Sequence, residues 1–388
     1  MEKIYQEALK LHEKFKGKIE MNVKQDFTKE DLALIYTPGV AQPCKEIAKN
    51  KDNIYKYTMK SNTIAVITDG SAVLGLGNIG AEASLPVMEG KCALFKRFGD
   101  VNAFPICLNT QNTEEIIDIV KHISPGLGGI NLEDISAPRC FEIEEKLKKE
   151  LNIPIFHDDQ HGTAIVVLAF LINALKLINK NKEDLNIVIN GAGAAGIAIA
   201  NLLHKYGFEN LLLCDSKGII CKERNDLNKY KQRLLLFTNK ENKVGSLKEA
   251  IKGADIFIGV SRGNILTKDM IKSMNSQPII LALANPTPEI LPSEALDAGA
   301  YIVGTGRSDY FNQINNVLVF PPLFHAILKL QIKEITDDVK IRTAHAIAST
   351  IRDEDLNVNN ILPNIFNDNL KENILKELSK YKEEKDNE

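Results

Sequence analysis

Short apolar runs that end in small or polar residues recur along the second half of the chain. They occupy residues 185–190, 211–215, 253–261, 277–286 and 300–306. A Gly-rich turn and the helix-compatible stretch 196–207 separate the first two runs. This alternation is typical of a parallel sheet that helices cover on both faces. It predicts a doubly wound, Rossmann-type sheet from about residue 185 to about residue 310.

The first 160 residues or so follow a less regular pattern. Strand-like runs at 62–68 and 102–108 alternate with amphipathic stretches at 113–123 and 140–151. A chain of 388 residues exceeds what one hydrophobic core usually supports, so we expect two domains. We predict an N-terminal α/β domain over residues 1–162 and a second domain over 163–388. In the second, C-terminal helices at about 323–388 follow the sheet and pack back on the first domain.

One apolar run, residues 163–178, has almost the composition of a membrane span. It is shorter than the roughly 20 residues that a span needs, and it contains Asn173 and Lys176. We interpret it as a buried helix that links the two domains. The charged stretch at residues 371–388 is interpreted as a solvated surface helix.

Composition narrows the possible partners. The net charge is −3, and Lys and Arg are scattered among carboxylates, so neither nucleic acid nor an anionic membrane is an expected partner. The six cysteines show no C-x-x-C spacing, which favours reduced thiols in a cytoplasmic protein. The N-terminal stretch lacks the apolar centre of a signal peptide.

Two glycine runs have the spacing of a dinucleotide-binding turn, one ending at Gly80 and one ending at Gly196. Such a turn needs a preceding strand, an uninterrupted helix after it and an acidic residue at the end of the next strand. The second run meets all three conditions, with Asp215 about 20 residues further on. After the first run, Pro86 is expected to break the helix, and no strand ending in an acid follows at the right distance. The predicted cofactor-binding residues are Gly191, Ala192, Gly193, Ala194, Ala195, Gly196 and Asp215.

The choice between NAD and NADP depends on the surroundings of Asp215. A carboxylate there favours the free 2′-hydroxyl of NAD and repels the 2′-phosphate of NADP. Lys217 lies two residues on and could accept that phosphate. NAD is therefore preferred, with NADP left open.

Two acidic segments indicate a cation. Glu133 and Asp134 are adjacent, and so are Asp158 and Asp159. Adjacent carboxylates repel each other, so a fold that buries them needs a compensating charge. A set of oxygen ligands suits Mg²⁺ or Mn²⁺. In the alternative interpretation these acids only cap helices, as Asp159 could for a helix beginning near Thr163, or pair with Arg139.

Zinc is the less favoured metal. His157 and His161 have the i, i+4 spacing of a zinc pair on a helix, but we expect no helix between Pro154 and Gly162. The Glu that usually accompanies such a pair is also missing from the intervening residues.

Lys91 and Tyr36 are candidates for proton transfer. Lys91 lies in an apolar segment after Gly90, and burial beside a metal ion would lower its pKa and make it a usable base. The alternative is a surface lysine with a buried stem. Tyr36 precedes a Pro-Gly turn that could hold its phenol over a cleft, although packing alone would explain it equally well.

Taken together, these motifs resemble the malic enzymes, in their short bacterial and archaeal form. The resemblance spans residues 36–321 and rests on motifs in the family's order. They are IYTPGVAQP, TDGSAVLGLGNIG, LPVMEGKCALFK, GGINLEDISAPRCFEIE, FHDDQHGTAIV, NGAGAAG, LANPTPEI and TGRSDYFNQINNVLVFP. It implies oxidative decarboxylation of (S)-malate to pyruvate and CO₂, with NAD or NADP, Mg²⁺ or Mn²⁺, and a homodimer.

The resemblance also implies a role for each matching residue. Tyr36 would be the general acid and Lys91 the general base, in contact with substrate. The metal ligands would be Glu133, Asp134 and Asp159, with Asp158 a catalytic residue beside them. Asn285 would hold substrate and cofactor, and Asn315 or Asn316 would hold substrate and nicotinamide. The first glycine run would belong to the substrate domain.

The sequence departs from the family at several positions. Larger malic enzymes place a malate-binding arginine in the first glycine run, where this chain has Ala72. The metal, Arg307 or a residue of a second subunit would then neutralise the substrate. Phe311 replaces a usual proline, and Pro322 and His325 replace a usual glycine and arginine.

Two other functions are compatible with parts of the pattern. One is a metal-independent NAD-dependent hydroxy- or amino-acid dehydrogenase that does not decarboxylate. The other is a module that binds NAD without turning anything over. Neither requires Glu133, Asp134 and Asp159 to accompany Lys91.

Overall fold

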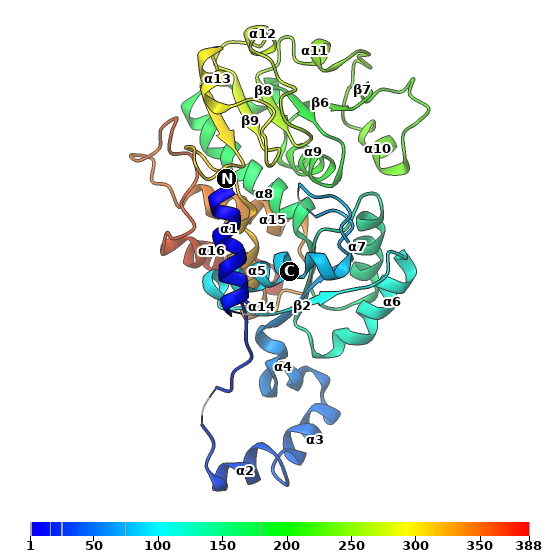
Figure 1. Ribbon diagram of the computed structural model, residues 1–388, viewed down its shortest axis with the longest axis vertical. Helices are drawn as coiled ribbons and strands as arrows, with labels where there is room; N and C mark the ends of the chain where they lie inside the picture. Colours follow the sequence, from blue (N-terminus) through cyan, green and yellow to red (C-terminus); the bar gives the residue numbers. More distant parts are fainter. Residues whose placement is uncertain (1, 16, 25, 74, 179, 388) are drawn as a thin grey trace.

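The computed structural model describes residues 2–15, 17–24, 26–73, 75–178 and 180–387. Two α/β bodies are stacked along the long axis, and an arm projects from the lower one (Figure 1). The strands are β1 Thr63–Thr68, β2 Asn102–Cys107, β3 Gly129–Leu132, β4 Ile155–His157, β5 Asn186–Asn190, β6 Asn210–Asp215, β7 Gly218–Ile219, β8 Ile256–Gly259, β9 Ile279–Ala282 and β10 Ile302–Thr305.

Sixteen α-helices are described within these residues. They are α1 Glu2–Phe15, α2 Lys29–Ile35, α3 Ala41–Lys49, α4 Ile54–Tyr57, α5 Ala81–Gly99, α6 Thr113–Ile123, α7 Arg139–Glu150, α8 Asp158–Leu177, α9 Ala194–Tyr206, α10 Lys229–Leu234, α11 Leu247–Ala250, α12 Lys268–Lys272, α13 Pro292–Asp297, α14 Phe320–Lys329, α15 Asp337–Ala348 and α16 Asn369–Asn387. Short 3-10 helices include η1 Lys51–Asn53, η2 Met59–Asn62, η3 Ser124–Gly126 and η5 Asn316–Leu318.

The first sheet has the strand order β2-β1-β3-β4, and all its pairs are parallel. Its central strand, β1, is buried along its whole length, as expected for a strand covered on both faces. In the register of the sheet, Ile67 of β1 lies beside Leu132 of β3, and Leu132 lies beside His157 of β4. The residues that follow these strands therefore emerge together at one edge.

The second sheet has the order β10-β9-β8-β5-β6-β7. All its pairs are parallel except β6–β7. The order reverses between β5 and β8, which both follow a helical connection, so a crevice is expected at the carboxyl ends of these two strands. This topology confirms the doubly wound sheet that the alternating pattern predicts.

Helix α8 joins the two bodies and packs against α9 and α15. It is the one helix among the described residues that is long and apolar enough to cross a membrane, yet 67% of its most apolar window is buried inside the protein. Its buried Asn173 donates to the carbonyls of Ala348 and Ile361. The helix begins at Asp158, five residues earlier than the apolar run suggests, because polar residues fill its first turn.

The C-terminal helices lie against the first body. Phe320 and Phe324 of α14 contact Phe95 of α5, with ring centroids 4.8 and 5.4 Å away. Helix α16 buries Leu370, Ile374, Leu378 and Tyr381 and packs against α14 and α15. The interpretation of this stretch as a solvated surface helix is therefore wrong for one of its faces, because its few apolar residues fall at helical spacing.

Pro86 does not end the helix that follows the first glycine run, so that prediction is wrong. Helix α5 runs through Pro86 from Ala81 to Gly99. The proline removes one backbone hydrogen bond near the start of the helix. Burial of Met88, Cys92 and Phe95 on the same helix offsets this loss.

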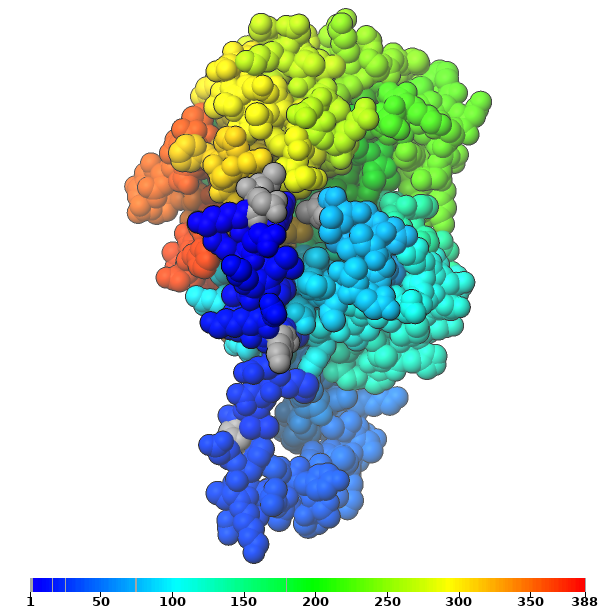
Figure 2. Space-filling view, viewed as in Figure 1, coloured from blue at the N-terminus to red at the C-terminus, as the bar shows by residue number. Residues whose placement is uncertain are grey.

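The arm consists of residues 19–50 and carries α2 and α3. It projects from the base of the molecule in the space-filling view (Figure 2). Neither helix contains a buried residue. Its exposed apolar side chains include Phe27, Leu32, Leu34, Ile35, Tyr36 and Val40.

Candidate active site

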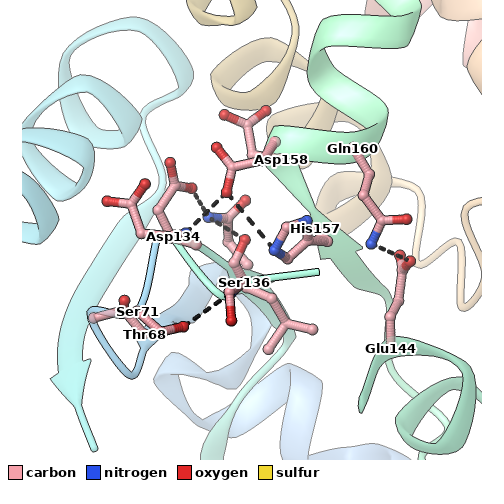
Figure 3. Close-up of polar contacts among 12 residues, drawn as sticks. Thr68, Ser71, Asp134, Ser136, Glu144, His157, Asp158 and Gln160 are labelled. Carbon is pink, nitrogen blue, oxygen red and sulfur yellow. Dashed lines mark hydrogen bonds and ion pairs between the residues drawn. The ribbon is translucent and has the colours of Figure 1, made fainter. Parts of the chain in front are cut away.

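The predicted acidic residues meet at the carboxyl edge of the first sheet. Glu133 and Asp134 follow β3, and Asp158 and Asp159 begin α8 directly after β4. Figure 3 shows Asp134 and Asp158 on one side of His157, with Glu144 and Gln160 on its other side. This position follows from the parallel register, which brings the ends of β3 and β4 side by side.

Three of the acids form a group that fits a cation. Glu133, Asp134 and Asp159 each offer an oxygen, and these atoms all lie within 4.8 Å of one another. The backbone N–H of Asp134 donates to Asp159 Oδ2 at 2.9 Å. Asp134 Oδ2 is buried and has no hydrogen-bond partner. A buried carboxylate oxygen without a partner is costly, and a bound cation would satisfy it.

Burial and mutual repulsion raise the pKa of Glu133, Asp134 and Asp159 above the usual carboxyl range. Three carboxyl groups in so little space keep their charge only beside a positive partner. Oxygen donors without nitrogen or sulfur suit Mg²⁺ or Mn²⁺. The residues present therefore fit the predicted divalent cation.

Neither histidine is in hydrogen-bond contact with these acids, although His157 Nε2 lies 3.7 Å from Asp159 Oδ2. His161 contacts both oxygens of Glu144 at 2.8 and 2.9 Å. His157 is fully buried, and burial lowers its pKa to about 4. The argument against zinc assumed no helix between Pro154 and Gly162, and that assumption is wrong because α8 begins at Asp158.

The alternative partner for the acids, Arg139, is bound elsewhere. Its Nη1 donates to Asp69 Oδ2 at 2.8 Å, and its Nη2 donates to Ser71 and Ser136. Asp69 is buried just after β1. Arg139 therefore neutralises the charge of Asp69 and holds the loops that carry Ser71 and Ser136. It does not pair with Glu133, Asp134 or Asp159.

Lys91 on α5 is the cation nearest to the acids. Its Nζ lies 2.8 Å from Glu133 Oε1 and 2.5 Å from Asp158 Oδ2, and 4.1 Å from the centroid of the Phe320 ring. Burial disfavours its charge, but the attraction of Asp158 and Glu133 is stronger and raises its pKa. The expectation that burial lowers the pKa of Lys91 is therefore wrong, because the sequence did not reveal these two contacts.

Asp158 is held by two donors, and a glycine leaves room for its other oxygen. Lys91 and Asn316 Nδ2 both donate to its Oδ2. A Cβ added to Gly162, one turn along α8, would lie only 1.9 Å from Asp158 Oδ1. Glycine at position 162 thus makes the space that Asp158 occupies.

Asn315 and Asn316, which follow the last strand of the second sheet, make different contacts. Asn316 reaches the site through Asp158. Asn315 instead caps η5, where its side chain accepts from the backbone N–H of Val317. Asn285 follows β9, and its neighbour Pro286 lies 3.5 Å from where a Cβ on Gly75 would be.

The first glycine run thus borders both domains. Ala72 donates its backbone N–H to the carbonyl of Asp134 at 2.9 Å, and Gly75 approaches Pro286 of the second domain. Leu74 of this run lies outside the described residues. The run lines the junction between the two domains beside the acids, where no dinucleotide turn is formed.

The second glycine run forms the turn between β5 and α9. Gly191 has φ +125°, and a Cβ on Gly196 would lie 1.7 Å from the carbonyl oxygen of Gly191. Gly193 faces open space. Ala194 and Ala195 begin α9, whose free N–H groups suit a pyrophosphate. Gly191, Ala192, Gly193 and Asp215 line a cavity of about 1000 Å³.

Asp215 is already paired in the protein alone. Arg224 contacts both its oxygens at 2.7 and 3.0 Å, and Lys231 Nζ lies 2.6 Å from Oδ2. Burial opposes the charge, but these hydrogen bonds hold the pKa of Asp215 at about 2. Its repulsion of a 2′-phosphate is thereby weakened, because two cations surround one carboxylate.

Some predicted residues are not brought to the site within one chain. Tyr36 is 73% exposed and lies in the arm, at the end of the molecule away from α8 (Figure 1). Arg307 pairs with Asp309 at 2.6 Å. Phe311 is exposed, and His325 contacts the carbonyl of Gly99.

Sequence reasoning missed Gly162, Arg224 and Lys231. Gly162 could have been noticed as a glycine inside the first turn of an apolar helix. Arg224 and Lys231 are nine and sixteen residues from Asp215, in a loop and a short helix. No periodicity links them, so only the folded loop reveals the contact.

The fold and the site define a two-domain NAD(P)-dependent oxidoreductase with a divalent-cation site between its domains. Two protein-family models match the chain. The model of the malic enzyme N-terminal domain matches residues 13–148, and the model of the malic enzyme NAD binding domain matches residues 160–376. The chain belongs to the malic enzyme family.

Relatives and solved structures agree over nearly the whole chain. The Bifunctional malic/malolactic enzyme of Bacillus subtilis is 52% identical over 97% of this chain and 92% of its own length. The NADP-dependent malic enzyme of Haemophilus influenzae is 50% identical over 91% of this chain and 47% of its own length. The crystal structure of an NAD-dependent malic enzyme from Thermotoga maritima covers 96% of this chain and 98% of its own, with 47% identity and a TM-score of 0.92.

Proposed function

We propose that this protein catalyses the oxidative decarboxylation of (S)-malate to pyruvate and CO₂, with reduction of NAD or NADP. The observation that carries the proposal is the group of Glu133, Asp134 and Asp159, of which the first two are buried, with Lys91 2.8 Å from Glu133. A simple dehydrogenase needs no such acids. Decarboxylation of a keto acid does need an electron-withdrawing centre beside its carbonyl oxygen.

Glu133, Asp134 and Asp159 would hold the divalent cation, and the turn from Gly191 to Gly196 would hold the cofactor pyrophosphate. When bound, the cation supplies Lewis acidity toward the C2 oxygen, and NAD(P) supplies a hydride acceptor.

Lys91 and Asp158 act together as the base. The Lys91 ammonium first gives one proton to the carboxylate of Asp158, 2.5 Å away, and the neutral amine then takes the proton of the C2 hydroxyl. Asn316 holds Asp158 in place for this transfer. The keto acid formed at C2 then loses its C4 carboxylate as CO₂, and the enolate of pyruvate remains.

Tyr36 donates the proton that C3 of this enolate requires, and it does so in the site of a second subunit. The arm that carries Tyr36 buries nothing within its own chain, although it presents Phe27, Leu32, Leu34 and Ile35 to solvent. A segment of this kind gains stability only when another surface covers it. A twofold homodimer would cover both arms and bring each Tyr36 to the partner's site.

The enzyme works in the cytoplasm. All six cysteines are free, which suits a reducing compartment.

The reaction is tested with purified protein, (S)-malate, Mn²⁺ and each cofactor. We expect equal amounts of reduced cofactor and pyruvate, and loss of both when EDTA removes the metal. The variant Asp159→Ala should lower kcat by at least about 100-fold and abolish calorimetric Mn²⁺ binding. Reduced cofactor without pyruvate, or activity that survives EDTA, would instead identify a metal-independent dehydrogenase.

A further inference from the structure

A second cavity lies where the arm joins the first domain, apart from the active site. It has a volume of about 390 Å³. Its lining comes from the end of α3, from η1, α4 and η2, from η3, from residues 151–153 between α7 and β4, and from the segment between α14 and α15. It contains none of the residues assigned above to substrate, metal or cofactor.

One of the residues that line this cavity is a buried lysine, Lys60. Lys60 is only 9% exposed, and its Nζ donates to the carbonyl of Pro125 at 2.9 Å. That contact uses one of the three N–H groups of the ammonium. Burial lowers the pKa of Lys60, and the charge of Lys333 lowers it further.

Lys333 brings a second charge to the same place. Its Nζ lies 3.9 Å from the centroid of the Tyr55 ring, and Lys60 Nζ lies 5.4 Å from the same centroid. Lys51 also lines the cavity, and Asp52 is the one carboxylate in its described lining. The cavity is therefore rich in positive charge.

Neither Lys60 nor Lys333 forms an ion pair with a carboxylate among the described residues. The two other lysines that are less than a tenth exposed are paired: Lys91 with Glu133, and Lys340 with Asp337 at 3.0 Å. A buried charge without a counter-charge is costly. Lys60 thus lacks the anion that the other two buried lysines have, and Lys333, which is partly buried, adds a second positive charge beside it.

We propose that this cavity binds a dianionic phosphate group, either free phosphate or a small phosphate monoester. The unused N–H groups of Lys60, the ammonium of Lys333 and the nearby Lys51 would donate to its oxygens, since lysine binds phosphate as a compact point charge. The bound group ties η2 to the segment before α15 at the root of the arm. This inference does not depend on the reaction proposed above.

Calorimetric titration of the full-length protein with inorganic phosphate tests the proposal. NAD is kept saturating, so that the α9 turn is already occupied. Lys333→Met should weaken the affinity by at least about tenfold, and Lys60→Met should do the same. Lys56→Met is the matched control, because Lys56 is an exposed lysine of α4 outside the cavity. Its affinity should equal that of the wild type.

A parallel titration with glycerol 3-phosphate separates the two sources. Tighter binding of the monoester identifies a phosphorylated metabolite, and tighter binding of inorganic phosphate identifies the free ion. Should Lys60→Met fail to fold, Lys333→Met decides, because its side chain is only partly buried. No saturable binding by the wild type, or equal affinity in Lys333→Met, would overturn the proposal.

Discussion

His157 shows how far the physical state of one residue is hidden from sequence. Its i, i+4 spacing with His161 raised zinc binding only as the less favoured possibility, and neither of its ring nitrogens has a hydrogen-bond partner in the fold. The side chain is fully buried and stays neutral, because burial lowers its pKa to about 4 from the usual 6.5.

Because His157 is buried and neutral, we expect the free energy of unfolding to fall at low pH in the wild type. The variant His157→Phe should not show this contribution. Between about pH 6.5 and pH 4 the unfolded chain binds a proton at this histidine and the folded chain does not, so stability falls as pH falls. The wild type should lose about 3 kcal/mol relative to the variant from pH 7.5 to pH 4. Urea unfolding of both metal-free proteins measures the difference. A difference that does not change with pH would show that His157 is protonated inside the fold.

We expect Arg224 to influence the preference between NAD and NADP, because it neutralises Asp215 where the 2′-phosphate of NADP would bind. Without it, Asp215 keeps only Lys231 as a side-chain partner and repels the phosphate more strongly. Arg224→Ala should reduce kcat/KM for NADP relative to NAD by about tenfold. Steady-state assays with both cofactors check this, and Arg233→Ala, an exposed arginine paired with Glu145, serves as the control. An unchanged ratio would remove Arg224 from cofactor selection.

At the scale of the element, the turn between β5 and α9 was the most predictable part of the site. Strand, glycines, helix and terminal acid are all local in sequence, so their spacing predicted the geometry. The sequence did not separate glycines that serve the fold from one that serves the ligand. Gly196 meets the backbone of Gly191, whereas Gly193 faces only the cavity.

These two glycines make a matched pair of substitutions. Gly196→Ala should destabilise the protein by about 1–3 kcal/mol, because its Cβ would lie 1.7 Å from a backbone oxygen. Gly193→Ala should leave the melting temperature unchanged and raise KM for the cofactor by about tenfold, since it obstructs close approach of the pyrophosphate. Thermal melts and cofactor titrations distinguish the two effects. Equal behaviour of the variants would contradict this division.

The start of α8 was predicted less well than that turn. Its first turn, from Asp158 to His161, is polar, so apolar periodicity could not reveal where the helix begins. Pro86 also led to too little predicted helix, because sequence rules give the local cost of a proline but not the tertiary burial that offsets it. Helix boundaries are the weakest part of such predictions wherever active-site residues replace the apolar pattern.

Gly162→Ala tests whether this first turn positions Asp158. The added Cβ would displace Asp158 Oδ1 and disturb the contacts to Lys91 and Asn316. We expect kcat to fall by about 100-fold while the helix remains folded. Gly126→Ala, where the Cβ meets nothing within 4 Å, is the control. Circular dichroism establishes folding, and full turnover by a folded Gly162→Ala would exclude the positioning role.

At the scale of the whole molecule, sequence predicted two α/β domains and a group of acids in the first domain that indicates a cation. These features depend on strand patterns and on the rule that parallel strands end at one edge. The contacts made by Arg139, Glu144 and Arg224 could not be predicted, because each joins segments whose separation in sequence carries no periodicity. The surroundings of Tyr36 could not be predicted for another reason. In the dimer proposed here, they are formed by the second subunit.

Complementation between inactive subunits tests the shared site directly. Tyr36→Phe and Lys91→Met should each be nearly inactive as homodimers, because each lacks one of the two proton-transferring groups. In a mixed dimer, one site would combine Lys91 of the first variant with Tyr36 of the second. Statistical exchange of subunits should therefore restore about a quarter of wild-type activity.

The same mixture separates the shared site from a site built within one chain. If Tyr36 reached Lys91 of its own subunit, every site in a mixed dimer would carry one defect, and mixing would restore nothing. A mixture of Lys91→Met with Asp159→Ala is the control, because both residues lie near Glu133 of the same chain and should not complement. Recovery in the first mixture alone shows that the arm completes the partner's site, and no recovery in either contradicts the dimer proposed here.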